Sequence, residues 1–416
     1  MAAGQRRVAL AHPEELRPVQ PVSATLRPER QPKLLVVGGS DLHRRIDFLL
    51  RLAERFEVSA AGSDRRLRPH FTDAGLDYHY YPASRGLSPV GDLVSIVRLT
   101  SLVRRLRPDI VHAFGTKSSL WGRFAARLGG APVVIGTLTG LGSLYVSGGP
   151  LRRLLRAGYG SLQWICCRIS DLTILQHVDD ADQLQKAGIA PSHKTTVVPG
   201  SGVRTDQFDP SRVAEDARLA IRHEMGAEAD SVVVTMVSRL IRSKGVMEFA
   251  AAAKLAGECC RNAVFVLVGP DDQESVDRLS SPELAELRKS VCWLGERRDI
   301  MDILGASDVF VLPSYYREGI PRVLLEAAAM GLPLISTRSP GCQEVVLDEI
   351  NGFLVEPRDS AQLAAAMERL IQDPHLRLRF GSTSRSRCVE AFDLSVVAAQ
   401  TESLYLRLLK DRHLPT

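Results

Sequence analysis

The chain has 416 residues, of which 45% are hydrophobic and 24% charged, and its formal net charge is +5. A chain of this length exceeds one ordinary hydrophobic core and indicates two to three domains. No apolar run approaches the ~18 residues that a membrane-crossing helix needs, which argues against a transmembrane protein.

Residues 1–32 contain Arg and Pro but no continuous apolar core, so they do not fit a secretory signal and are expected to form a flexible tail. Seven cysteines, including the pairs Cys166-Cys167 and Cys259-Cys260, show neither metal-ligand spacing nor a disulfide framework. We expect them to be buried thiols in a reducing cytoplasm.

Strands alternate with helices along the rest of the chain, which predicts α/β layers built on parallel sheets. The first strand is expected at Leu34–Gly38 (LLVVG), and it leads into Gly39-Ser40. A glycine turn at the carboxyl end of a first strand lets a ligand approach the backbone closely, so Gly39 is a candidate binding residue. Two glycines after a strand are also typical of an ordinary tight turn.

The segment from Leu93 to Arg168 holds eleven Arg or Lys residues and one acid, Asp109, so the positive charge is concentrated there. Two parts of it, Leu93–Leu106 and Leu151–Arg168, have apolar residues at helical spacing with arginines beside the stripe. In the first part the stripe comprises Leu93, Ile96, Leu99, Leu102 and Val103. Basic amphipathic helices are typical of proteins that bind anionic membrane surfaces. Ordinary surface helices fit the pattern as well, whereas nucleic-acid binding would lack aromatic platforms and reader motifs.

The next strand, Ile110–His112, is expected to bring His112 and Lys117 to the same edge of the sheet, and a helix follows. A further strand, Val133–Ile135, ends in the Gly-rich loop that contains Thr139. His112 also fits a packed strand residue, and Lys117 also fits a solvated lysine at the start of a helix.

The run Ser231–Ser238 (SVVVTMVS) is short, β-branched and apolar, which is typical of a buried parallel strand. It is followed by a turn with Arg239 and Lys244, and a helical pattern begins near Val246. A strand, a basic turn and a helix start form an anion cradle. The two cations could neutralise a diphosphate leaving group, and the alternative is that they are solvated turn residues.

The block Glu318–Pro333 (EGIPRVLLEAAAMGLP) predicts a loop followed by a helix. Pro321 stands where helices begin, since the N–H that it lacks is not needed there. Met330-Gly331 ends the helix with a residue that tolerates positive φ.

Two carboxylates share this block. Glu318 lies in the loop at the helix mouth, beside the N–H groups of Gly319 and Ile320. Glu326 lies on the helix, roughly 7–8 Å along its axis from Pro321. Two acids and a positive helix end over that length suit a nucleotide sugar, with one acid for sugar hydroxyls and the other for the ribose. The anionic diphosphate would lie near the helix end.

These motifs resemble those of glycosyltransferase family 4, which has the GT-B architecture. The family has an R-x4-K pair followed by Gly, here Arg239, Lys244 and Gly245, and two glutamates separated by seven residues, here Glu318 and Glu326. Residues 292–346 are similar to the family over their whole length. One departure is Ser238, where many relatives have Gly.

The resemblance implies a role for each of these side chains. Arg239 and Lys244, with Arg322 beside them, would stabilise the donor diphosphate. Glu318, with the N–H groups of Gly319 and Ile320, would orient the transferred sugar. Glu326 would hold the ribose, and the nucleobase would lie near residues 293–297 by analogy of fold.

Residues 33–410 resemble a subgroup that extends oligosaccharides on undecaprenyl diphosphate, such as the transferase that adds N-acetylgalactosamine to lipid-linked bacillosamine. The shared marks are the Lys117 loop, Thr139-Gly140-Leu141-Gly142, Asp179-Asp180 and Gly200-Ser201-Gly202-Val203. The resemblance implies retaining transfer of a hexose or N-acetylhexosamine from a UDP-sugar to a polyprenyl-diphosphate-linked sugar, in bacterial surface polysaccharide or glycan biosynthesis. It also implies a cytoplasmic protein bound peripherally to the inner face of the plasma membrane.

On the acceptor side the candidates are Lys117, His112 and Thr139. Many members of the family carry His where this chain has Thr139, and a threonine cannot act as a base near neutral pH. In the family the leaving diphosphate is understood to assist the acceptor hydroxyl, so the mechanism does without that histidine.

The expected layout is two facing Rossmann-like domains: a first at residues 33–206 that binds the acceptor, and a second at 207–390 that binds the donor. Residues 391–416 would return to the first domain as a helix. No metal is expected, because the basic pair takes its role. Asp180-Ala181-Asp182 opens a helical pattern and is interpreted as a cap.

Three other functions stay open. A sugar-nucleotide epimerase shares the architecture but not the glutamate block. A catalytically silent subunit that binds nucleotide sugars is suggested by Thr139, although Glu318, Arg239 and Lys244 argue against it. A transferase with a soluble acceptor is the third alternative.

Overall fold

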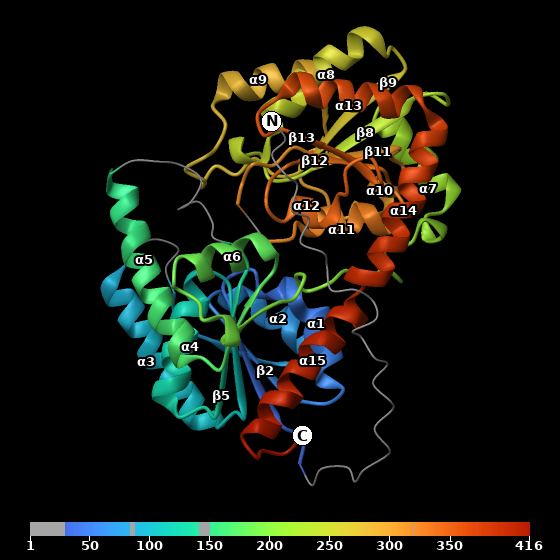
Figure 1. Cartoon of the computed structure of the whole chain (residues 1–416). Coiled ribbons are helices and arrows are strands. Elements are labelled where there is room, and N and C mark those ends of the chain that lie inside the picture. The colour runs from blue at the N-terminus through green and yellow to red at the C-terminus, as the bar shows by residue number, and fades with distance from the viewer. Residues whose placement is uncertain (1–29, 84–87, 141–149, 318) are drawn as a thin grey trace, which may run out of the picture.

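Two α/β domains, each built on its own parallel sheet, make up the computed structural model of this chain (Figure 1). The structure describes residues 30–83, 88–140, 150–317 and 319–416. The predicted fold class, two facing domains with parallel sheets and a C-terminal helix on the first, is confirmed.

The first sheet has seven strands in the order β3-β2-β1-β4-β5-β6-β7, and every neighbouring pair is parallel. The strands are β1 Lys33–Val37, β2 Glu57–Gly62, β3 Asp77–Tyr80, β4 Ile110–Phe114, β5 Val133–Leu138, β6 Leu172–Leu175 and β7 Thr195–Val197. The helices are α1 Ile46–Ala53, α2 Arg68–Asp73, α3 Pro89–Leu106, α4 Lys117–Gly129, α5 Pro150–Ile169 and α6 Val178–Lys186. Short 3-10 turns are η2 Leu42–Arg45, η3 Arg65–Leu67 and η5 Ser192–Lys194.

Strand β1 illustrates why this sheet is covered on both faces. Leu34 and Val36 lie in one apolar cluster, with side chains of α1 and of the C-terminal helix α15 (Leu394–Asp411). Leu35 and Val37 lie in another cluster, with side chains of α3 and α4. Successive side chains of a strand point to opposite faces, so a continuous apolar run requires cover on both sides.

The second sheet has six parallel strands in the order β10-β9-β8-β11-β12-β13. The strands are β8 Val232–Val237, β9 Ala263–Val268, β10 Cys292–Trp293, β11 Val309–Leu312, β12 Leu334–Thr337 and β13 Gly352–Val355. The helices are α7 Glu215–Glu224, α8 Val246–Cys259, α9 Ser281–Ser290, α10 Ile300–Gly305, α11 Arg322–Ala329, α12 Cys342–Val345, α13 Ser360–Gln372 and α14 Pro374–Phe392. Two 3-10 turns are η6 Pro210–Arg212 and η7 Arg242–Lys244.

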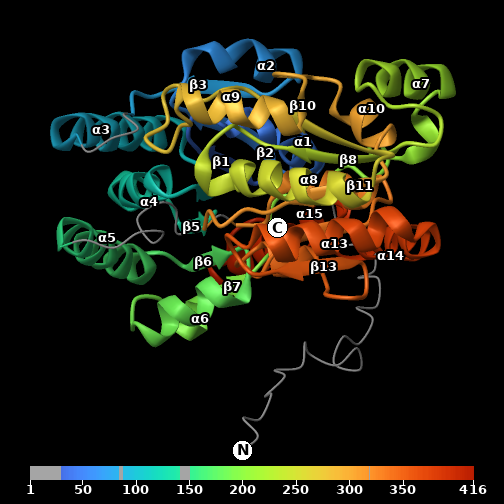
Figure 2. The ribbon, with the colours of Figure 1, turned by 90° about the horizontal axis from the view of Figure 1, so that it is seen from above.

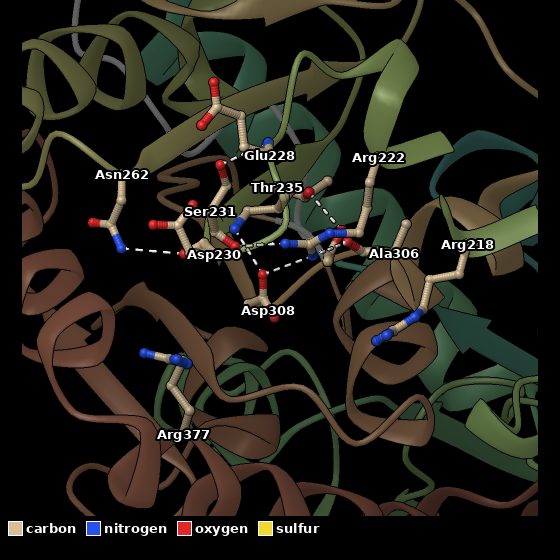
Figure 3. Close-up of polar contacts among 12 residues, drawn as sticks. Arg218, Arg222, Glu228, Asp230, Ser231, Thr235, Asn262, Ala306, Asp308 and Arg377 are labelled. Carbon is tan, nitrogen blue, oxygen red and sulfur yellow. Dashed lines mark hydrogen bonds and ion pairs between the residues drawn. The ribbon is translucent and has the colours of Figure 1, made fainter. Parts of the chain in front are cut away.

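An aspartate before β11 fixes the amino end of this sheet (Figure 3). Asp308 Oδ2 accepts hydrogen bonds from the backbone N–H of Val233 at 2.8 Å and from Arg222 Nη1 at 3.0 Å. Arg222, which comes from α7, also donates to the carbonyl oxygen of Ser231 at 2.5 Å. The hydrogen-bonded carboxylate of Asp308 therefore fixes the register of β8 and β11 at the amino ends of these strands.

The same device recurs in the first domain. Asp171, before β6, accepts from Val134 N–H at 2.8 Å and from Arg127 at 2.6 Å. Asp109, before β4, accepts from Lys33 N–H at 2.7 Å and from Arg30 at 2.8 Å. In both domains, an aspartate just before a strand thus bonds to the backbone of the neighbouring strand and to an arginine.

Arg30 also corrects the predicted tail. Residues 30–32 were expected to be flexible, but Arg30 pairs with Asp109 and the carbonyl of Pro32 accepts from the N–H of Glu57 at 2.9 Å. Residues 1–29 lie outside the described part of the chain.

The chain passes between the domains twice, and the two connecting segments are hydrogen-bonded to each other. Val203, after β7, accepts from Leu394 N–H and donates to the carbonyl of Phe392, both at 2.9 Å. Thr205 Oγ1 donates to Asp393 Oδ2 at 2.5 Å. Beyond this point α15 returns along the first domain and packs against α1 (Figure 1).

Candidate functional site

A cleft of about 580 Å3 lies between the domains, at the carboxyl edges of β1 and β8. The first domain lines it with His43, Arg44 and Asp47. The second domain lines it with Val237, Ser238, Arg239, Lys244, Val268, Gly269, Pro270, Glu296, Arg297, Ile300, Pro321, Arg322, Val323 and Glu326. The strand ends of a doubly wound sheet form such ligand crevices because the helices on either side begin there.

One wall of the cleft is the basic turn after β8. The strand ends at Val237, one residue before the end of the predicted run, and α8 begins at Val246, as predicted. Gly245 joins turn to helix with φ of 79°, and a Cβ there would lie 2.2 Å from the carbonyl oxygen of Pro313. Only glycine fits this place, and it brings Arg239 and Lys244 to the cleft.

The charges of this wall are partly engaged. Arg239 Nη1 lies 2.5 Å from Asp272 Oδ2, and about half of the arginine side chain is exposed. Lys244 Nζ lies 5.9 Å from the centre of the Tyr316 ring. An anion that binds here would therefore compete with Asp272 for Arg239 in a partly solvated setting.

A second wall of the cleft is the start of α11. The helix begins after Pro321, which is its N-cap, and Gly331 follows its end with φ of 71°. Glu326 lies in the cleft and accepts a hydrogen bond from Arg322 Nε at 2.9 Å. Burial raises the pKa of Glu326, and the adjacent Arg322 partly offsets that effect. The predicted pair of Glu326 and Arg322 is thus brought together with Arg239 and Lys244.

Glu318 lies outside the described residues, but the residues on either side of it are defined. Gly319 and Ile320 were expected to offer their N–H groups to the donor. In the structure Gly319 N–H donates to the carbonyl oxygen of Thr139 at 3.0 Å, and Ile320 N–H donates to Gln176 Oε1 at 3.1 Å. This corrects their assignment, because both groups are engaged with the first domain rather than with the cleft.

His112 was expected at the acceptor side, and this is wrong. It lies in the middle of β4, is 1% exposed, and its ring nitrogens bond to Tyr405 Oη at 2.5 Å and Thr137 Oγ1 at 2.6 Å. Burial, with a contribution from Arg45, lowers the pKa of His112 well below its usual value. A neutral imidazole enclosed in the core cannot contact an acceptor.

The other first-domain candidates lie at the carboxyl edge of the sheet. Lys117 begins α4 and lies 2.6 Å from Asp92 Oδ1. Thr139 follows β5 and offers its carbonyl oxygen to Gly319. Gly39 follows β1 without lining the cleft. These three residues remain predictions.

The first-domain wall of the cleft was not predicted. His43 and Arg44 come from η2, immediately after the glycine turn, and the carbonyl of Arg44 accepts from Arg322 Nη1 at 2.6 Å. Their signal was the run DLHRRID after Gly39-Ser40, since the loop after a first strand reaches the same edge as the ligand.

The loop predicted to hold a nucleobase also reaches the cleft, through Glu296 and Arg297. Arg297 donates hydrogen bonds to the carboxylates of Asp299 and Glu224, and these bonds raise the pKa of Arg297. Trp293 lies farther back and donates from Nε1 to the carbonyl of Gly269 at 2.9 Å.

Asp180 does not cap a helix end as expected. The N-cap of α6 is His177, and Asp180 pairs with Arg317 of the other domain at 2.9 Å. Within the described ranges, no three His, Cys, Asp or Glu side chains gather as a metal site would require. The cysteines are free thiols, and five of them are buried as expected, whereas Cys259 is exposed and Cys292 is only partly buried.

The predicted amphipathic stripe of residues 93–106 is only partly correct. Leu99, Leu102 and Val103 are buried, as expected, but Leu93 is 62% exposed. In α3 an outward row of apolar residues runs beside it: Val90 (76% exposed), Val94 (41%) and Val97 (58%). Among the described residues no helix is long and apolar enough to span a membrane.

Comparison with protein families matches both domains. The description "Glycosyl transferase 4-like domain" matches residues 47–200, and "Glycosyl transferases group 1" matches residues 218–387. The two matches are separated by residues 201–217, and together they span most of the chain.

Two curated relatives are similar over nearly the whole chain. One is the UDP-Gal:alpha-D-GlcNAc-diphosphoundecaprenol alpha-1,3-galactosyltransferase of Escherichia coli, 29% identical over 88% of this chain and 93% of its own. The other is the N,N'-diacetylbacillosaminyl-diphospho-undecaprenol alpha-1,3-N-acetylgalactosaminyltransferase of Campylobacter jejuni, 27% identical over 90% and 97%.

Solved structures agree on the fold. A crystal structure of Anabaena HepE in complex with UDP superposes with a TM-score of 0.73 at 19% identity, over 90% of this chain and all of that one. A glycosyltransferase of Rickettsia africae superposes with a TM-score of 0.75 at 18% identity, over 92% of this chain and all of that one.

Proposed function

We propose that this chain, which belongs to the glycosyltransferases that join a 4-like domain to a group 1 domain, moves one sugar from a UDP-sugar to a polyprenyl-diphosphate-linked sugar. It is a hexosyl- or N-acetylhexosaminyltransferase. The full-length similarity to two transferases whose names give a diphosphoundecaprenol acceptor carries this proposal. The process it serves would be bacterial surface polysaccharide or glycan biosynthesis.

The donor would lie in the interdomain cleft. Its diphosphate would lie against Arg239 and Lys244, with Arg322 nearby, and its ribose hydroxyls would bond to Glu326. Glu318 would contact the transferred sugar. Fixed cations that face a leaving group act most strongly where charge develops, so the basic pair would take the place of a metal.

The transfer would retain the anomeric configuration. The bond from the anomeric carbon to the diphosphate oxygen breaks, and the acceptor hydroxyl oxygen bonds to the same face of the sugar. The hydroxyl proton passes to the departing phosphate oxygen. This route needs no protein base, which is consistent with the enclosure of His112 and with a threonine at position 139.

The acceptor would reach the cleft from a membrane surface. The outward face of α3 combines the apolar row Val90, Leu93, Val94 and Val97 with the exposed arginines Arg98, Arg104 and Arg105. On α5, Trp164 and Ile165 are exposed as well, and α3, α4 and α5 follow one another along one side of the molecule (Figure 2). Apolar side chains flanked by arginines suit the interface of an anionic bilayer. The enzyme would thus act in the cytoplasm, on the inner face of the plasma membrane, with Lys117 toward the acceptor.

The test is transfer with defined substrates. Purified protein is incubated with UDP- and GDP-sugars and short-chain polyprenyl diphosphate sugars in the presence of a chelator, and mass spectrometry scores extended lipid. A gain of one sugar that disappears in Glu318→Ala supports the proposal and its independence of metal. Nucleotide binding without turnover of any donor would instead favour a silent subunit, and transfer to water-soluble sugars alone would favour a soluble acceptor.

A further inference from the structure

Residues on both sides of position 318 are bonded to the first domain. On one side, Arg317 donates from Nε and Nη2 to Asp180 Oδ1 at 3.1 and 2.9 Å. Arg317 Nη2 also donates to Gln183 Oε1. Asp180 is 2% exposed, so this ion pair is largely removed from water.

On the other side, the backbone of Gly319 and Ile320 is bonded to Thr139 and Gln176. Gln176 is 6% exposed, and its side chain packs directly on Gly319, where an added Cβ would lie 1.7 Å from Gln176 Oε1. No side chain fits at position 319 while Gln176 holds this place. The loop is therefore bound to the first domain by backbone hydrogen bonds as well as by the ion pair between Arg317 and Asp180.

The first-domain groups come from one short stretch of the chain. Gln176 follows the end of β6, and Asp180 and Gln183 lie on α6, four and seven positions later and thus on one face. His177, which is fully buried, holds the backbone of Asp180, because its Nδ1 accepts a hydrogen bond from Asp180 N–H at 3.2 Å. We call Gln176, Asp180 and Gln183 the β6–α6 corner.

We propose that Gln176 and Asp180 are positioning residues for the transfer, which seat the segment carrying Glu318 when the domains close. The inference rests on the proposed function, in which Glu318 contacts the transferred sugar. The contacts of Gln176 and Asp180 with Arg317 and Ile320 join the two domains, so they form only when the domains lie as close together as in this structure. In the proposed function the nucleotide binds to a different set of groups, Arg239, Lys244 and Glu326, which line the cleft from the second domain. Closure would thus complete the sugar site of a donor that is already bound.

This separation predicts which kinetic parameter changes. Gln176→Met keeps the length of the side chain but removes the acceptor of the Ile320 hydrogen bond. Asp180→Asn keeps the shape but removes the charge that holds Arg317. Both variants should lower kcat at least tenfold while the Kd for UDP, measured by calorimetry, stays within twofold of the wild type. Gln176→Glu, which restores an acceptor, should recover part of the lost kcat.

A matched control lies on the same helix. Asp182 is exposed and pairs only with Lys186 among the described contacts, so Asp182→Asn should keep the wild-type kcat. In a double-mutant cycle, Asp180→Asn with Arg317→Gln should be no slower than the worse single variant, because both remove the same contact. Unchanged kcat in Gln176→Met and Asp180→Asn, or a parallel loss of UDP affinity, would overturn the inference.

Hydrogen exchange tests the corner without relying on turnover. With UDP bound, the amides of Gly319 and Ile320 should exchange at least tenfold faster in Gln176→Met and Asp180→Asn than in the wild type. Equal exchange would refute the seating of the loop. If the wild type transfers no sugar, the proposed function fails, whereas this exchange measurement still decides whether the corner holds the loop.

Discussion

At the scale of single residues, the cleft is a set of charges that already have partners. Arg239 faces Asp272, and Glu326 faces Arg322. A nucleotide that binds here therefore exchanges existing contacts for its own, and its affinity reflects the difference between the two. This makes the neighbours of the binding residues as informative as the binding residues.

Asp272→Asn should strengthen UDP binding. The substitution frees Arg239 from a partly exposed ion pair, and such pairs are worth about 0.2–1 kcal/mol, which corresponds to roughly a 1.4- to fivefold lower Kd. Calorimetric titration with UDP at low salt measures this. Asp271→Asn is the control, since Asp271 accepts from Gln273 and not from Arg239. Weaker binding in Asp272→Asn would show that Asp272 itself serves the nucleotide.

Glu326→Gln should change both the pH dependence of the free energy of unfolding and the Kd for UDP. Because burial raises the folded-state pKa of Glu326, its contribution to stability is present below the unfolded pKa and is lost as the pH rises through the folded pKa. Urea unfolding should show that the free energy of unfolding falls less with rising pH in Glu326→Gln. The Kd for UDP should rise about tenfold, since hydrogen bonds to a charged acceptor are lost. Unchanged affinity would remove Glu326 from the ribose site.

His112→Phe should affect stability and not turnover. It leaves the buried hydroxyls of Tyr405 and Thr137 without their partner, at a cost of about 1–3 kcal/mol in the free energy of unfolding. The depressed pKa means that wild-type stability is lost as the pH falls below the ordinary value of 6.5, and the variant should lack that part of the loss. The kcat of the folded variant should remain within twofold, and a kcat lowered a hundredfold would return His112 to the site.

At the scale of elements, the sequence pattern explains the turn after β8 better than it explains helix α3. The turn after β8 carries its reason locally, because Gly245 is required by its φ and by its approach to Pro313. Helix α3 does not. Its inward stripe is set by helical spacing, but the outward row at Val90, Leu93, Val94 and Val97 has no partner of its own within the described chain that would explain it.

Leu93→Glu and Val97→Glu together should abolish vesicle binding while leaving the fold intact. Both side chains are exposed, so the thermal midpoint should change by no more than about 2 °C. Cosedimentation with vesicles of anionic lipid should fall at least fivefold, and wild-type binding should weaken with salt. Leu219→Glu, an equally exposed change on α7, is the control. Undiminished binding by the double variant would place the membrane contact on another surface.

At the scale of the molecule, the C-terminal helix completes a domain that begins more than three hundred residues earlier. Val397, Tyr405 and Leu409 are buried in the same apolar cluster as β1 and α1. The domains are therefore in contact at the crossing at Asp393, at the bond from Arg322 to the carbonyl oxygen of Arg44, and at the loop around position 318. Closure is then a motion about the crossing that makes or breaks the contacts of the loop.

A chain that ends at Phe392 should lose the first domain and keep the second. Removal of α15 uncovers side chains whose burial contributes about 1.5–3 kcal/mol each, together comparable to the stability of a whole domain. Limited proteolysis should then cleave residues 33–197 rapidly while residues 207–392 resist and still bind UDP. Resistance of both regions would mean that the first domain folds without α15.

The chain by itself determined what depends on neighbours in sequence. The apolar runs at β1 and β8, the glycine after Lys244 and the eight-residue spacing of the glutamates are local, so they predicted the parallel sheets, the basic turn and α11. The family resemblance then followed from those motifs. Periodicity and turn chemistry act over a few residues, which is why these expectations were confirmed.

Which groups already have partners depends on contacts between residues that are far apart in the sequence. His112 is enclosed by Tyr405, 293 positions away, and Ile320 N–H is engaged by Gln176, 144 positions away. Leu93 faces outward on a helix whose pattern predicted the reverse, because the width of the buried face depends on what packs there. Hydrogen bonds and burial are satisfied across the whole fold, and no spacing along a single chain records where its distant partner will lie.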